Sequence, residues 1–91
     1  MARLSYTIRL TPRAVKQISK LDPGIARRIR NFLEQKLAHL DNPRQLGKNL
    51  VHEDFWRYRV GDYRILTTID DDQVLVLIVE IAHRRHIYEN L

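Results

Sequence analysis

Three arginines lie within "FWRYRVGDYRI", residues 55–65, a segment that otherwise has the pattern of a β-hairpin. If Gly61-Asp62 is a two-residue turn, Arg57 and Arg59 share one face of the hairpin, and Arg59 lies directly opposite Arg64. Like charges that face each other destabilise a sheet by tenths of a kcal/mol up to about 1 kcal/mol. The planar guanidinium group suits phosphate or carboxylate, so this cluster predicts a site for an anionic ligand.

A second interpretation of these arginines is a solvated sheet face that binds nothing. The side chains would then splay apart or pair with carboxylates such as Glu53, Asp54 or Glu80. Charged runs are common on protein surfaces, so this interpretation stands as an alternative. The strict separation of apolar and basic residues between the two faces favours a ligand. Lys48, in the loop before the hairpin, is a further candidate contact.

The C-terminal segment "AHRRHIYENL", Ala82–Leu91, brings two His, two Arg and a Tyr together. Arg84 and Tyr88 are four residues apart and share a face if the segment is helical. Arginines stabilise the charge that develops in phosphodiester cleavage, and a titratable group transfers the proton, so the composition suits that reaction. The alternative is that His83 and His86 are ordinary surface residues, as a lone histidine usually is. Without a third ligand they indicate no metal site, and we expect neither metal nor cofactor.

Two helices are predicted ahead of the hairpin. Ser5–Leu10 alternates as a strand does, and Thr11-Pro12 then supplies an N-cap and a proline for the first turn. Asp22-Pro23 repeats this signal, so the second helix follows almost at once and ends at Asp41-Asn42-Pro43. Apolar residues recur at helical spacing in both, which indicates a helical hairpin on a sheet. The outer face of the second helix carries the basic residues Arg27, Arg28, Arg30 and Lys36.

Three strands are predicted for the second half of the chain. Residues 41–54 are loop-like, with one short turn around Arg44–Gly47, and Phe55–Val60 and Tyr63–Asp70 then form the hairpin. Val74–Ala82 is apolar on both faces, as a central strand is, but its register with the preceding strand stays open. The order β-α-α-β-β-β, with a short C-terminal helix or tail, predicts an α+β domain with two helices on one face of a mainly antiparallel sheet.

Length and composition limit the possible classes of protein. The 91 residues fit one domain, 1–91, and 44% hydrophobic residues are too many for a disordered chain. A net charge of +5 and a pI near 10.0 suit a polyanionic partner, either nucleic acid or an acidic protein. Cysteine is absent, and neither a signal peptide nor an apolar run of about 20 residues is present. These features predict a cytoplasmic protein without a membrane partner.

The hairpin "WRYRVGDYRI", the apolar strand after it and the ending "AHRRHIY" together resemble the RelE-type toxins of bacterial and archaeal toxin–antitoxin pairs. The resemblance covers nearly the whole chain and favours this branch of the RelE/ParE superfamily over the gyrase-poisoning ParE-type toxins. It implies a ribosome-dependent endonuclease that cuts mRNA in the A site by attack of a 2′-hydroxyl, without metal. It also implies a cognate RelB-like antitoxin, with operator DNA bound only by the toxin–antitoxin complex.

The resemblance also implies roles for individual basic residues. Arg64 and Arg84 would stabilise the charge of the pentacovalent phosphorane. Arg57 and Arg59 would orient the mRNA backbone, and Lys48 would add an RNA contact. The basic outer face of the second helix has two interpretations, docking on ribosomal RNA or simple solubility.

Proton transfer is the point at which this chain departs from the pattern of the family. Tyr88 would stack on a base or help to transfer a proton. The best-studied members carry lysines in the hairpin, one of them the proposed general base, whereas arginine stays protonated. The expected base here is therefore His83, with His86 as the second candidate.

Three other functions are alternatives to RNA cleavage. A superfamily relative that poisons a topoisomerase by binding alone would lack the basic and tyrosine cluster, which this chain has. A nucleic-acid-binding module without catalysis would form salt-sensitive complexes that stay uncut. A scaffold that only pairs with an acidic protein would keep its toxicity after replacement of Arg64 or Tyr88.

Overall fold

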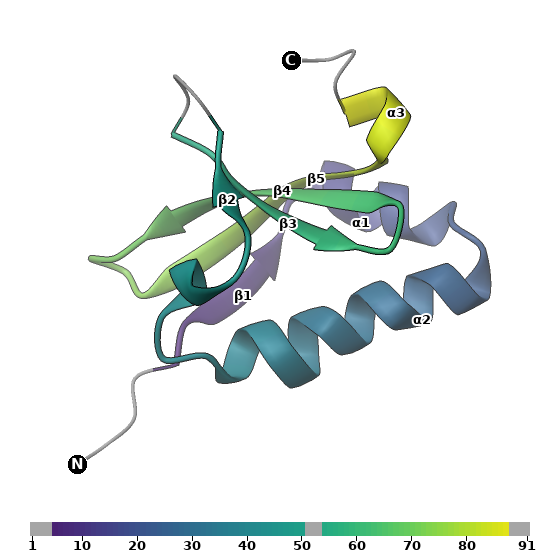
Figure 1. Cartoon of the computed structure of the whole chain (residues 1–91). Coiled ribbons are helices and arrows are strands. Elements are labelled where there is room, and N and C mark those ends of the chain that lie inside the picture. Colours follow the sequence, from purple (N-terminus) through teal and green to yellow (C-terminus); the bar gives the residue numbers. More distant parts are fainter. Residues whose placement is uncertain (1–4, 51–53, 88–91) are drawn as a thin grey trace.

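The computed structural model describes residues 5–50 and 54–87. Its centre is a five-stranded sheet with the strand order β1-β5-β4-β3-β2 (Figure 1). The strands are β1 (Thr7–Leu10), β2 (Lys48–Asn49), β3 (Trp56–Val60), β4 (Tyr63–Asp70) and β5 (Leu75–His83). β1 pairs with β5 in parallel, and the other neighbouring pairs are antiparallel. The predicted α+β class with a mainly antiparallel sheet is therefore confirmed.

Helical segments lie on the sheet and at its edges. They are α1 (Pro12–Ser19), α2 (Pro23–Asn31), η1 (Phe32–Lys36), η2 (Leu37–His39), η3 (Pro43–Gln45) and α3 (Arg84–Ile87). α1 and α2 form the predicted helical hairpin, and Figure 1 shows α2 and α3 on opposite sides of the sheet. No helix within the described ranges is long and apolar enough to cross a membrane.

The second predicted helix is less regular than its sequence pattern indicates. Its α-helical part ends at Asn31, and the chain continues through the π-helical turn η1 and the 3-10 turn η2 instead of one α-helix to Leu40. The Leu37 N–H bonds to the carbonyls of both Leu33 and Phe32, and the five-residue spacing to Phe32 is that of a π-helix. This irregularity changes the direction of the side chains around it.

The strand boundaries also differ in two places from the prediction. Residues 41–54, expected as a loop with one short turn, contain η3 and also β2, which pairs with the start of β3. Val74, the predicted first residue of the last strand, has a φ of 53°. This left-handed conformation is strained for a β-branched residue and breaks the strand, so β5 starts and ends one residue later than predicted.

α1 begins where its sequence predicts and is attached to the edge of β5. The Thr11 side chain accepts a hydrogen bond from the Ala14 N–H (3.1 Å), which is N-cap geometry. The Thr11 hydroxyl donates to the Val79 carbonyl (3.1 Å), and the Gln17 side chain accepts from the Ile81 N–H (2.7 Å). These contacts satisfy the part of the β5 edge that lies beyond the end of β1.

The core lies between the helical hairpin and the sheet. Its buried residues are Ala14, Ile18, Ala26, Ile29, Leu33, Leu37, Tyr58, Ile65, Val76, Ile78 and Ile81. Tyr58 is fully buried and its hydroxyl donates to the Pro43 carbonyl (2.6 Å), and burial raises the pKa of this hydroxyl well above its usual value. Tyr58 thus belongs to the core, and Phe32, Trp56 and Tyr63 pack half-buried against it.

A polar cluster on the surface ties β1 to the β4–β5 turn and to η3. The carboxylate of Asp71 accepts a hydrogen bond from the Tyr6 hydroxyl (2.7 Å) and one from the Arg44 guanidinium (2.9 Å). The bond from Arg44, followed by the bond from Tyr6, lowers the pKa of Asp71. The same Asp71 bond raises the pKa of Tyr6.

We expect Asp71→Asn to lower the midpoint of thermal unfolding slightly at pH 7 and to have no effect near pH 2. Because the pKa of Asp71 is lower in the folded state than its ordinary 3.8, its contribution is present above pH 3.8 and is lost as the pH falls through the folded pKa. The effect is small because the pair is exposed. Thermal melts at both pH values test this, with Asp72→Asn in the same turn as control. An equal effect of Asp71→Asn at both pH values would contradict it.

Candidate functional site

The hairpin of β3 and β4 has the register that the sequence predicts. Arg59 pairs with Arg64, and Tyr58 pairs with Ile65. Gly61 has a φ of 58°, and a positive φ at the first of two turn residues is the type II′ pattern that suits the twist of a hairpin. Tyr58 and Ile65 are buried toward the helices, whereas Arg59 is exposed on the other face. The predicted separation of apolar and basic faces is therefore confirmed.

The three hairpin arginines open onto a hollow of about 330 Å³ at the β3 side of the sheet. Its lining residues are Phe32, Lys36, Leu46, Gly47, Lys48, Arg57, Tyr58, Arg59 and Arg64. Five of these nine residues are cationic and none is acidic. The cations come from η1, β2, β3 and β4, so only the folded chain brings them together. We call this feature the cationic hollow.

The loop before β3 is held tightly, which fixes the position of Lys48. The Trp56 indole N–H donates to the Leu46 carbonyl (2.7 Å). Gly47 has a φ of 81°, and a Cβ atom there would lie 2.4 Å from the Arg57 carbonyl oxygen, so only glycine fits this close approach. Lys48 then pairs across the strands with Arg57, which places a fourth cation beside the hairpin arginines.

Among the residues that the structure describes, no carboxylate lines the hollow. Glu80 forms an ion pair with Arg13 of α1 (2.8 Å). Asp54 does not line the hollow, and Glu53 lies outside the described residues. The Arg64 guanidinium instead donates to two backbone carbonyls of the hairpin turn, at 3.3 and 3.4 Å. The hollow is therefore suited to an anion, and Arg64 is partly oriented before one binds.

Arg84 lies at the hairpin turn and does not line the hollow. Its N–H donates to the Asp62 carbonyl (2.8 Å), and its Nε is 4.0 Å from the Asp62 carboxylate. Its side chain is about half exposed, so it can turn toward a ligand that approaches from the arginine face. The predicted α3 is present, but Tyr88 lies outside the described residues.

His83 lies on the other side of the sheet from the hairpin arginines. It pairs with Tyr63, whereas Arg64 pairs with Ala82, and neighbouring strand residues point to opposite faces. The His83 and Tyr63 rings make an edge-to-face contact with centroids 5.4 Å apart. The His83 Nδ1 accepts a hydrogen bond from the Arg85 N–H (3.3 Å). The structure thus does not bring His83 to the hollow, and its role as general base stays a prediction.

Lys36 is the residue of the hollow that sequence reasoning placed elsewhere. Its charge assigns it to the outer face of the second helix, and it is exposed there, but it also lines the hollow together with Phe32. Phe32 and Lys36 are four residues apart and so share a helix face, and this spacing is the signal that could have placed Lys36 beside Phe32. Among the described residues, no three His, Asp or Glu side chains gather as metal ligands would.

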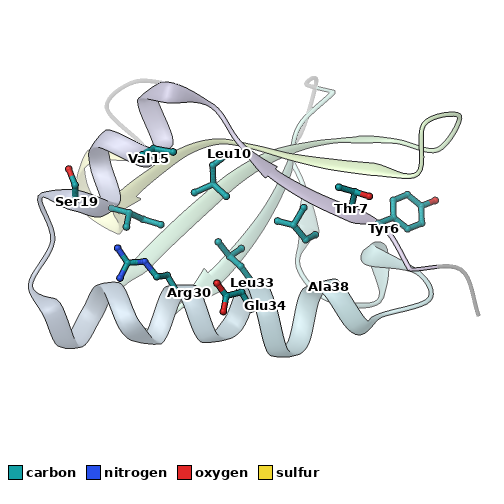
Figure 2. A pocket seen from close by; sticks show the side chains of 11 residues that line it. Tyr6, Thr7, Leu10, Val15, Ser19, Arg30, Leu33, Glu34 and Ala38 are labelled. Atoms are coloured by element: carbon teal, nitrogen blue, oxygen red, sulfur yellow. The ribbon is translucent and has the colours of Figure 1, made fainter.

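A second feature is an apolar groove of about 610 Å³ between β1, α1 and the second helix. Its lining residues are Tyr6, Thr7, Ile8, Leu10, Val15, Ile18, Ser19, Arg30, Leu33, Glu34 and Ala38. Figure 2 shows Leu10 and Leu33 directed toward each other across the groove, with Arg30 and Glu34 along one side. Val15 is a large apolar side chain with 55% of its surface exposed. The groove runs beside β1, which is an edge strand of the sheet.

Comparison with known proteins gives consistent matches over nearly the whole chain. The family described as the ParE toxin of the type II toxin–antitoxin system parDE matches residues 8–88. Toxin RelG of Mycobacterium tuberculosis is 34% identical over 87 residues, which cover 93% of this chain and 98% of that protein. Toxin RelE of the same organism is 35% identical over 85 residues, covering 91% of this chain and 86% of that protein.

Solved structures show the same fold. The toxin–antitoxin complex RelBE2 from Mycobacterium tuberculosis contains a chain with a TM-score of 0.80 and 33% identity, covering 91% of this chain and 95% of that one. The archaeal RelE–RelB complex from Pyrococcus horikoshii gives a TM-score of 0.71 at 22% identity, covering 90% and 98%. The expected relationship is confirmed: the chain belongs to the ParE/RelE family of type II toxin–antitoxin toxins and is a toxin of the RelE type.

Proposed function

We propose that this toxin is a ribosome-dependent endoribonuclease that cleaves mRNA in the A site without a metal ion. The observation that supports this most is the cationic hollow, a space of about 330 Å³ whose described lining residues include five cations and no carboxylate. Attack of a 2′-hydroxyl on the adjacent phosphate adds negative charge to the phosphoryl oxygens. Cations that are oriented in advance stabilise that charge more than they stabilise the substrate.

The residues divide into two groups in this proposal. Arg57, Arg59 and Lys48 bind the phosphates of the mRNA backbone and set its position. Arg64, oriented by the carbonyls of the hairpin turn, contacts the phosphate that reacts, and Arg84 joins it from the side of Asp62. Tyr88 stacks on a base or assists proton transfer.

Primer extension on a defined mRNA tests the proposal, using purified full-length protein with and without ribosomes. The expected result is a set of cuts that appear only with ribosomes and that map to the A-site codon. Cuts without ribosomes would indicate a general ribonuclease and contradict ribosome dependence.

Binding without cleavage is a second candidate function. It is favoured by one observation, that the described lining of the hollow contains no histidine and no carboxylate to act as a base near neutral pH. Arginine stays protonated, so the lining cations that could transfer a proton are Lys36 and Lys48. Intact mRNA on ribosomes that nevertheless retain the protein would support this second function.

We also propose that the apolar groove binds a helix of a cognate RelB-like antitoxin. Several solved relatives are toxin–antitoxin complexes, which supports a protein partner of this kind. The groove has apolar walls with Arg30 and Glu34 at one side, and an amphipathic helix fits such a surface through residues at i, i+3 and i+4. We propose in addition that the toxin is cytoplasmic and that operator DNA is bound only by the toxin–antitoxin complex.

We expect Val15→Glu to weaken neutralisation by the antitoxin by tenfold or more while cleavage is retained. A buried, unpaired carboxylate in an apolar interface costs on the order of several kcal/mol, whereas Val15 is exposed in the free toxin and its replacement leaves the fold intact. The measurement is a titration of cleavage activity with the antitoxin. Gln35→Glu, exposed and outside the groove, is the matched control. If the antitoxin neutralised both variants equally, its binding site would lie outside the groove.

A further inference from the structure

We infer that Lys36 is an additional RNA-binding residue, which the π-helical turn η1 directs into the cationic hollow to bind a backbone phosphate. The inference deepens the proposed function and rests on it for the identity of the ligand as RNA. It concerns a residue on the second helix, outside the hairpin and the C-terminal segment that define the rest of the site.

The backbone dihedral angles of Lys36 itself depart from those of an α-helix. Its φ and ψ are −116° and −62°, away from the α-helical values of about −63° and −42°. The next residue, Leu37, donates its N–H to the Phe32 carbonyl across five residues. Single π-helical turns of this kind occur often at functional sites.

The neighbouring apolar residues keep their place in the core despite this turn. Leu33 is 4% exposed and Leu37 is fully buried, so the packing of the helix on the sheet is preserved on both sides of Lys36. Lys36 is exposed and lines the hollow. In a regular helix Lys36, seven residues after the buried Ile29, would lie on the core face. The π-helical turn therefore moves this cation off the core face to the hollow while leaving the core in place.

The charge around Lys36 makes its position favourable for an anion. Lys36 adds a positive charge to a hollow that already contains Lys48, Arg57, Arg59 and Arg64, and none of the nine lining residues is acidic. Like charges brought together repel one another, and a bound anion reduces that repulsion. The hollow extends from the hairpin to η1, which is a suitable arrangement for successive phosphates of one strand.

The aromatic part of the lining points to a nucleic acid rather than to a small free anion. Phe32, from the same π-helical turn, lines the hollow and is only half-buried. Its ring lies against Tyr58, with centroids 5.7 Å apart. A cationic groove with an accessible aromatic ring is the usual surface for single-stranded nucleic acid, whose bases stack on such rings.

The test is the salt dependence of RNA binding by the full-length protein, measured by fluorescence anisotropy with a fluorescein-labelled hexaadenylate RNA. For single strands, each phosphate contact contributes about 0.7 to the slope of log K against log salt concentration. Lys36→Met and Lys36→Gln are each expected to reduce the magnitude of the slope by about 0.7 and to weaken binding about two- to fivefold at low salt. Lys36→Arg is expected to retain the wild-type slope.

Lys20→Met is the matched control, because Lys20 is an exposed lysine at the end of α1 that does not line the hollow. An unchanged slope for both neutral Lys36 variants would overturn the inference, as would wild-type protein whose binding to this RNA does not depend on salt. Primer extension on the same proteins separates the two proposals. Cleavage by the wild type with unchanged Lys36 slopes rejects only the role of Lys36, and reduced slopes without any cleavage reject only the endonuclease.

Discussion

Replacing Arg64 by alanine is expected to reduce ribosome-dependent mRNA cleavage by about 10²–10³-fold. Arg64 lies opposite Arg59 in the hairpin, and its guanidinium is held by the carbonyls of Gly61 and Tyr63, so little reorganisation is needed when a phosphate binds. Removal of one oriented donor from a site that stabilises an oxyanion usually has an effect of this size. The quantity to measure is the single-turnover rate constant of primer-extension cuts at saturating ribosomes.

Arg9→Ala is the matched control for this prediction. Arg9 is an exposed arginine on β1, at the edge of the sheet opposite β2, and does not line the hollow. Its replacement is expected to leave the rate unchanged. Arg64→Lys should fall between the wild type and Arg64→Ala, because it keeps the charge but loses the bidentate geometry. An Arg64→Ala protein that cleaves at the wild-type rate would show that the arginine cluster has no part in the chemistry.

The second large effect is on stability. We expect Ile65→Ala to lower the free energy of unfolding by about 2–5 kcal/mol. Ile65 is fully buried and lies between Tyr58 of β3 and Ile81 of β5, where a smaller side chain leaves a cavity. Small domains have a total stability of about 5–15 kcal/mol, so this loss is a large part of it. Urea unfolding followed by circular dichroism measures it.

Val15→Ala is the control for the core substitution, because more than half of the Val15 surface is already exposed. A surface replacement of this kind changes stability by about 0.5 kcal/mol or less. If Ile65→Ala were as mild as Val15→Ala, the hairpin would not be packed on the helices as described. Cleavage by the Ile65 variant is best measured well below its unfolding midpoint, so that loss of fold is not mistaken for loss of chemistry.

The sequence alone determined the features that depend on short-range interactions. Thr11 and Pro12 set the start of α1 because an N-cap and a first-turn proline act within one turn of helix. Gly61 supplies the positive φ of the hairpin turn, and the turn fixes the register that pairs Arg59 with Arg64. Alternation along the strands then places the arginines on one face and Tyr58 on the other.

Only the tertiary structure decided how the separate basic residues combine. The register between β4 and β5 shifts between Leu66 and Thr67. The part of β5 that follows this shift pairs with the start of β4, and this pairing puts His83 on the helix face. That register depends on packing between strands far apart in the chain, which no local pattern specifies. Lys48 reaches the hollow through the pairing of β2 with β3.

Tertiary packing also decided the position of Lys36. Its charge assigned Lys36 to the outer face, although in a regular helix it would lie four residues after Phe32 and seven after Ile29, on the face that packs on the sheet. In the folded protein, the chain adopts a π-helical turn there, and Leu33 and Leu37 both stay buried against the sheet. The composition of the chain thus predicts a basic site, but long-range packing decides which of its cations surround one space.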